Sequence, residues 1–166
     1  MSSIQGRLSH YPAATEKIVV FDKYQDVSAK DHERMCQAGD IIIDYELSIA
    51  SPLPKRDVIL KSKNNKRRLA SMLYTFTVDD NVTMDTRDDG AFGHDEADIT
   101  MISYVLVAAT SGKGVIRVLS DDTDVFVLLV YWVYWADLQC KVQMERWDGT
   151  VLDINATCAD LGPKCL

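Results

Sequence analysis

The fold class is decided by one stretch of the sequence, residues 115–135, VIRVLSDDTDVFVLLVYWVYW. It begins with a short, mostly branched aliphatic run, as in a buried strand. Small polar and acidic residues follow, and residues 125–135 are then apolar nearly all round, which predicts a buried helix. A strand that passes through an acidic loop into a helix is the building unit of α/β proteins.

The chain on the N-terminal side repeats this alternation. Short apolar runs predict strands, and apolar side chains at three- and four-residue spacing predict helices. The predicted strands are 17–22, 41–43 and 82–84. The predicted helices are 29–38, 65–76 and 95–109. Because strands and helices alternate, we expect an α/β fold with a mainly parallel sheet and flanking helices.

The C-terminal part of the chain adds a hairpin. Residues 139–154 alternate weakly in polarity around Asp148-Gly149, a dipeptide typical of hairpin turns. Residues 155–161 predict a last short helix. The sequence therefore predicts a small C-terminal β-hairpin beside the main sheet.

Length and composition indicate one globular domain. The 166 residues, 47% of them apolar, correspond to about one domain, which we assign to residues 17–166 after an N-terminal tail of residues 1–16. The uncharged stretch of residues 125–136 has twelve residues and that of residues 99–112 has fourteen, whereas a membrane span needs about 20. Residues 1–12 lack the apolar block of a secretory signal. We expect no membrane contact and an intracellular protein, the nucleus included.

The cysteines and histidines show no zinc-ligand spacing, so we expect reduced thiols and no zinc site. The sequence Asn155-Ala-Thr matches a glycosylation acceptor. Because no secretory signal accompanies this match, we regard it as coincidental.

Charge is unevenly distributed along the chain. The net charge of −7 argues against a protein coated with basic residues for nucleic-acid binding. Seven of the 18 basic residues nevertheless fall within residues 55–68, and 11 of the 25 acidic residues fall within residues 79–124. This segregation is compatible with a polyanion that binds at the basic strip and is processed at the acidic segment. The alternative is two solvated surface patches.

Five carboxylates occur where the chain leaves predicted strands or enters predicted helices: Asp22, Glu96, Asp98, Asp122 and Asp124. In open α/β sheets the functional crevice lies outside the carboxyl ends of the strands. Gathered carboxylates repel one another by about 1 kcal/mol per pair at 4 Å in water, so a cation is needed to offset them. Mg²⁺ or Mn²⁺ suits an all-oxygen site and can promote phosphodiester cleavage.

Each carboxylate also has a structural interpretation. Asp22 can begin a turn, residues 95–98 can favour the helix dipole, and Asp122 can cap the next helix. One helix needs only one cap, however, and residues 120–124 supply four candidates. The excess favours a functional role for the group.

A resemblance supports that role. Residues 94–98, HDEAD, are followed by an apolar helix, a glycine turn, an apolar strand and residues 120–125, SDDTDV. This series resembles PIN-like nucleases of the flap-endonuclease type, in particular transposon-associated animal proteins with an (H)EEAD…SPDTDV signature. Residues 20–24 (VFDKY), 28–34 (SAKDHER) and 65–69 (NKRRL) resemble three further elements of that group. The resemblance extends over residues 17–166.

The resemblance implies a PIN-like, Rossmann-like three-layer fold and a nuclease site. The implied catalytic residues are Asp22, Glu96, Asp98, Asp122 and Asp124. The last four of these would bind the metal ion. The implied contacts to the nucleic-acid backbone are Lys30, Arg34, Lys66, Arg67 and Arg68.

The chain departs from the family pattern in three places. The family has an earlier strand with another aspartate, which nothing before Lys17 supplies, and a Gly-Cys-Asp motif beyond the position of Leu166. The family's glycine after VFD is Lys23 here. From these departures we expect an incomplete domain, an incomplete site and weak or no turnover.

Two function classes remain. The first is a Mg²⁺-dependent phosphodiesterase acting on DNA or RNA, with a metal-bound water as nucleophile. The second is a non-catalytic remnant of such a nuclease that binds metal, nucleic acid or an unknown protein partner. A phosphatase or phosphoacceptor domain is disfavoured, because residues 22–26, DKYQD, lack its nucleophile motif.

The aromatic residues of the predicted helix 125–135 leave a choice open. They are Tyr131, Trp132, Tyr134 and Trp135. Such rings can stack on bases, but in a nearly all-apolar helix a core position or another buried contact is more usual.

Overall fold

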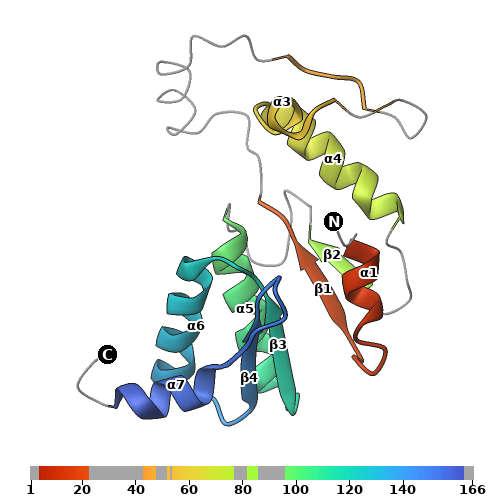
Figure 1. Cartoon of the computed structure of the whole chain (residues 1–166). Coiled ribbons are helices and arrows are strands. Elements are labelled where there is room, and N and C mark those ends of the chain that lie inside the picture. Colours follow the sequence, from red (N-terminus) through yellow and green to blue (C-terminus); the bar gives the residue numbers. More distant parts are fainter. Residues whose placement is uncertain are drawn as a thin grey trace. The chain divides into compact units, whose positions relative to one another are not determined.

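The computed structural model describes residues 4–22, 43–47, 52, 54–76, 82–85 and 96–162, and the structural statements below concern these residues. Contacts divide the chain into two compact units, Met1–Asp95 (unit 1) and Glu96–Leu166 (unit 2). Both units combine helices and strands (Figure 1), so the predicted α/β class is confirmed. One domain over residues 17–166 stays a prediction, and each unit is described by itself.

Unit 1 contains a two-stranded parallel sheet. Strand β1 (Lys17–Val20) pairs with β2 (Val82–Asp85) in a register that places Lys17 opposite Val82. Both strands were predicted. The segment expected to be a tail contains helix α1 (Ile4–Ser9), whose six residues, IQGRLS, are too few to show a helical period and include a glycine.

Two helices of unit 1 carry the basic strip. Helix α3 (Arg56–Ile59) is a single turn that the sequence did not indicate, and α4 (Lys63–Phe76) begins two residues before the predicted start. Ser62 caps α4, because its Oγ accepts a hydrogen bond from the backbone N–H of Asn65 at 3.2 Å. The helix predicted over 29–38 and most of the strand predicted over 41–43 lie outside the described residues.

Unit 2 is built on a three-stranded sheet of order β3-β4-β5. Strand β3 (Val115–Leu119) is parallel to β4 (Lys141–Glu145), which is antiparallel to β5 (Val151–Asp153). Helix α6 (Thr123–Trp135) forms the crossover between the two parallel strands. Helix α5 (Ala97–Thr110) leads into β3, and α7 (Ile154–Leu161) follows β5 (Figure 1).

The predicted C-terminal hairpin is confirmed in the connection from β4 to β5. The backbone N–H of Arg146 donates to the carbonyl of Thr150 at 2.9 Å. Gly149 has a φ of 88°, which glycine adopts without the strain that a side chain would cause. The Oδ1 atom of Asp148 accepts from the N–H of Thr150 at 2.8 Å and closes the turn.

The core of unit 2 lies on one face of this sheet. Val125 and Leu129 of α6 are completely buried, in one cluster with Val142 and Met144 of β4. Helices α5 and α7 add further members to the cluster: Ile102, Val105, Ile154 and Cys158. Because α5 packs on α6 and α6 packs on α7, the three helices form one layer.

The other face of the sheet carries the charged and amide side chains of the strands together with three apolar ones, Val115, Leu119 and Val151. Arg117 donates to Glu145 at 3.0 Å and to Gln143 at 2.7 Å, and Lys141 lies 3.5 Å from Asp153. Sheets buried on both faces have apolar runs in place of this alternation. The described strands thus form two small sheets, one of them mixed. Among the described residues the prediction of a single, mainly parallel sheet is not met, because β1 and β2 form a separate sheet and the hairpin turns β5 antiparallel to β4.

One amide side chain binds α7 to the beginning of β4. Asn155 accepts from the backbone N–H of Val142 at 2.7 Å through Oδ1. Its Nδ2 donates to the carbonyls of Cys140 at 3.1 Å and Leu138 at 3.5 Å. The amide of the apparent glycosylation acceptor therefore has a structural use.

We expect Asn155→Ala to lower the free energy of unfolding of unit 2 by about 1–3 kcal/mol, because it leaves partly buried backbone groups without partners. All three tryptophans lie in unit 2, so urea unfolding followed by tryptophan fluorescence measures this loss. Gln139→Ala is the matched control, since that exposed amide donates to the carbonyl of Asp137 at 3.0 Å, and its loss should change stability by less than about 0.5 kcal/mol. Equal losses in both variants would contradict the role of Asn155.

Candidate functional site

Four of the predicted catalytic carboxylates lie at one end of unit 2. Helices α5 and α6 precede and follow β3 through short connections, so both run opposite to β3, and they pack against each other. Their N-termini are therefore at the same end, where the parallel strands β3 and β4 finish (Figure 1). This acidic end comprises Glu96, Asp98, Asp122 and Asp124.

The loop from β3 to α6 is held by its own polar groups. Asp122 is the N-cap of α6, and its Oδ1 accepts from the N–H of Asp124 at 2.9 Å. Ser120 Oγ accepts from the N–H of Asp122 at 3.1 Å, and Ser120 N–H donates to the carbonyl of Glu145 at 3.1 Å. The structural interpretation of Asp122 as a helix cap is thus confirmed, and it does not exclude a second use of the same carboxylate.

Asp121 joins this loop to the hairpin, a role that sequence reasoning missed. Its Oδ1 accepts from the backbone N–H of Trp147 at 2.9 Å and lies 3.6 Å from Arg146 Nε. Both side chains are exposed in part, so the ion pair contributes at most about 1 kcal/mol. The parallel pairing of β3 with β4 brings the residues that follow both strands together, which a sequence pattern alone does not reveal.

Glu96 and Asp98 occupy the N-terminus of α5. Glu96 is at the N-cap position, and its carbonyl accepts from Thr100 Oγ1 at 3.2 Å, but its side chain makes no capping bond. Asp98 lies in the first turn, where a carboxylate interacts favourably with the helix dipole. The dipole interpretation of Asp98 is therefore compatible with its position.

The donors of the acidic end have the right chemistry for Mg²⁺ or Mn²⁺, since both ions prefer carboxylate oxygens. Within the described part of the chain, no three side chains of His, Cys, Asp or Glu are gathered in a way that could hold a metal ion.

The remaining predicted site residues lie elsewhere. Asp22 is exposed and follows β1 in unit 1. Lys30 and Arg34 fall outside the described residues. Lys66, Arg67 and Arg68 lie in the first turns of α4, where Lys66 is half-buried and the other two are exposed.

Arg68 has a structural partner. Its Nη1 donates to the carbonyl of Tyr45, in the segment 43–47. The completely buried Asn65 binds the same segment, because it accepts from Tyr45 N–H at 2.8 Å and donates to Ile43 O at 2.9 Å. The element NKRRL thus begins with a residue that anchors a neighbouring segment.

Asp44 completes this anchor and offsets part of the positive charge near the start of α4. Ser62 Oγ donates to one carboxylate oxygen of Asp44, and Asn64 Nδ2 donates to the other at 2.6 Å. These two hydrogen bonds lower the pKa of Asp44, and the nearby Arg68 charge lowers it further, against a smaller opposing effect of burial. Sequence reasoning did not single out Asp44, because residues 43–47 are separated from α4 along the chain.

No protein-family model, curated protein or solved structure matches the chain.

None of the described helices is both long enough and apolar enough to pass through a bilayer.

We expect Asp44 to titrate below 3.8 in the folded protein, with Ser62→Ala moving its pKa back up. Because the folded-state pKa is depressed, the stabilisation by ionised Asp44 is fully present above its unfolded pKa of about 3.9 and disappears as the pH falls through the folded pKa. Carboxyl-detected NMR titration measures the value. A pKa of Asp44 at or above 3.8, or one that Ser62→Ala leaves unchanged, would contradict the hydrogen-bond assignment.

Proposed function

We propose that the acidic end of unit 2 belongs to a metal-dependent nuclease-like site that hydrolyses phosphodiester bonds in DNA or RNA. One observation carries this proposal. Two segments far apart in the sequence, one with Glu96 and Asp98 and one with Asp122 and Asp124, begin neighbouring helices at the carboxyl end of a parallel strand pair. In α/β sheets this edge is where ligands bind. The resemblance to PIN-like nucleases, with their three-layer fold, supports the same assignment.

Electrostatics favours a cation at this end. Four carboxylates generate a negative potential that the dipoles of α5 and α6 offset only in part. A hard divalent ion would offset more of it. Because no three candidate ligands converge among the described residues, we assign no catalytic step to an ion. What these side chains supply is negative charge and oxygen donors at one edge of the sheet.

The proposal extends to residues outside unit 2. Asp22, in unit 1, is the fifth catalytic carboxylate that the resemblance implies. Lys66 and Arg67, with Lys30 and Arg34, would contact phosphates, a sequence-independent mode of binding. Arg68 is a weaker candidate, because its guanidinium already binds the carbonyl of Tyr45.

A second candidate is a non-catalytic binding module. The bonds of Asp121 and Asp122 favour it, because both carboxylates already support the fold, the first through Trp147 and Arg146 and the second through the cap of α6. On this alternative the acidic end would bind a cation or a basic partner without turnover.

We expect Mg²⁺ or Mn²⁺ at 100 times its dissociation constant to stabilise unit 2 by about 2.7 kcal/mol, seen as a higher melting temperature. Because the sequence predicts an incomplete site, we expect at most weak metal-dependent cleavage of a labelled oligonucleotide. Asp122→Asn/Asp124→Asn should weaken metal affinity at least about 10-fold, the lower range for residues that merely support metal ligands. At the same metal concentration this leaves at most about 1.4 kcal/mol of the stabilisation, and any cleavage should fall at least about 10-fold. Asparagine at 122 is still a good N-cap, so the variant removes charge without removing the cap.

Asp160→Asn is the matched control, since Asp160 is an exposed carboxylate on α7 away from the helix N-termini. Metal-dependent stabilisation without cleavage would favour the binding module. If metal neither stabilises unit 2 nor supports cleavage, the nuclease proposal fails, and the binding module is restricted to a basic partner. Cleavage that persists in the double variant would indicate contamination or a different site.

We expect oligonucleotide binding to weaken with salt, with a log–log slope of about 0.7–0.9 per phosphate contact. Lys66→Ala/Arg67→Ala should reduce this slope by about 1.4–1.8. Filter binding across a salt series measures it, and Lys141→Ala, on β4 of unit 2, serves as the control for loss of an exposed lysine. An unchanged slope in the double variant would leave the basic strip as a solvated helix surface.

A further inference from the structure

Helix α6 has a second apolar face that the core does not use. Val127, Tyr131 and Trp135 are 56%, 44% and 69% exposed. Their four-residue spacing places them in one continuous row along the helix, which we call the α6 stripe. We expected the aromatic side chains of α6 to be buried, and this is wrong for Tyr131, Tyr134 and Trp135, which are exposed. Of the four, only the half-buried Trp132 packs against the core cluster.

The two rings of the α6 stripe are parallel to each other. Tyr131 and Trp135 are stacked, with ring centroids 6.3 Å apart and planes 5° from parallel. Trp132 meets Tyr131 edge-on at 5.4 Å, which supports the tyrosine ring from the side. Because the faces of aromatic rings carry negative charge density, exposed rings of this kind attract arginine and lysine side chains.

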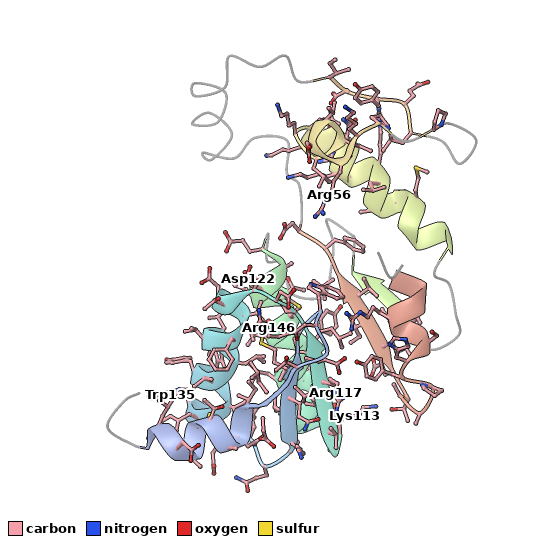
Figure 2. All side chains as sticks on the ribbon, viewed as in Figure 1. Arg56, Lys113, Arg117, Asp122, Trp135 and Arg146 are labelled. Carbon is pink, nitrogen blue, oxygen red and sulfur yellow. The ribbon has the colours of Figure 1, made fainter. Side chains whose placement is uncertain are left out.

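The charges of unit 2 are divided between its helices and its strands. The described basic residues all lie on strands or in the turns beside them: Lys113, Arg117, Lys141 and Arg146. Helices α5, α6 and α7 contain no lysine or arginine in their described sequences. Figure 2 shows this division, with Asp122 and Trp135 labelled at the two ends of α6 and the labelled basic residues of unit 2 on the strand side.

Carboxylates stand at both ends of the α6 stripe. Asp124 is exposed and precedes Val127 by three residues, so it lies on the same face of α6. Asp137 is exposed and follows the last turn of the helix. An apolar and aromatic row bounded by negative charge requires a partner that is apolar along its middle and positive at its ends.

We propose that the α6 stripe is a docking surface for a cationic amphipathic helix of a partner protein. The apolar side of that helix would cover Val127 and the two rings. Its lysine or arginine side chains would lie beside Asp124 and Asp137 and over the face of Trp135. Pairing of an amphipathic helix with an exposed apolar helical surface is a common mode of peptide recognition.

The other occupants of such a surface fit the charges less well. Nucleic-acid phosphates would be repelled by the flanking carboxylates, so the rings are not a platform for base stacking. In a symmetric pair of two copies, Asp124 and Asp137 would face acidic residues of an identical helix. Both arrangements bring like charges together, whereas a cationic helix brings opposite charges together.

The test uses a fluorescein-labelled peptide of about 20 residues made of leucine and lysine, with leucine at helical spacing, and the full chain. Fluorescence anisotropy should show binding that weakens between about 0.05 and 0.5 M salt. Tyr131→Ala/Trp135→Ala should weaken binding at least about tenfold. Trp147→Ala is the matched control, because that tryptophan is 52% exposed but lies in the hairpin, and it should bind as the parent chain does. Melting temperatures of all variants verify that each is folded.

A peptide with glutamate in place of lysine should not bind. Equal binding of the two peptides, or unchanged affinity in the double variant, would overturn the proposal. Two further results would also overturn it by assigning the α6 stripe to another occupant. One is a dimer, seen by analytical ultracentrifugation, that Tyr131→Ala/Trp135→Ala dissociates, and the other is oligonucleotide binding that the same variant abolishes.

Discussion

Val125 and Leu129, on the inner face of α6, are completely buried in one cluster with Val142 and Met144 of β4. This packing fixes α6 as the crossover between β3 and β4 and so makes the two strands parallel. Parallel strands finish at the same edge, and the acidic loop that leaves β3 therefore lies beside the connection that leaves β4. The position of the candidate site depends on this burial of apolar side chains rather than on any property of the carboxylates themselves.

In each unit, one asparagine side chain fixes a segment of backbone by hydrogen bonds. Asn65 binds the N–H and the carbonyl of the segment 43–47, and Asn155 binds one N–H and two carbonyls around the entry to β4. An amide side chain can donate and accept at once, so it can satisfy backbone N–H and C=O groups that are not paired with a neighbouring strand. Both residues occur in sequence patterns that invite a different interpretation, a nucleic-acid-binding element and a glycosylation acceptor. In both, the structure assigns the asparagine to the fold.

The carboxylates in the loop between β3 and α6 have structural roles in addition to the function proposed for them. Asp122 caps α6 with one oxygen and Asp121 holds the hairpin, so an acidic loop is useful here even without a metal. Helices α5, α6 and α7 contain no basic residue. The described basic residues lie on the strands or in the turns beside them, and Arg117, Lys141 and Arg146 form ion pairs with carboxylates. The resulting acidic helical layer is compatible both with a cation at the helix N-termini and with a basic partner along α6.

The sequence by itself determined the local elements. The spacing of apolar residues, the polar loops and the Asp148-Gly149 turn predicted β3, α6 and the hairpin. These signals can be seen in the sequence because each depends only on residues that are close together along the chain. The sheet partners, the contact of Asp121 with Arg146 and the exposure of Trp135 were decided only by the tertiary structure. Each depends on which distant segment arrives next to a side chain. The apolar sequence of α6 predicts that at least one face of the helix is buried. How much of its surface stays exposed to solvent depends on how many helices and strands pack around it.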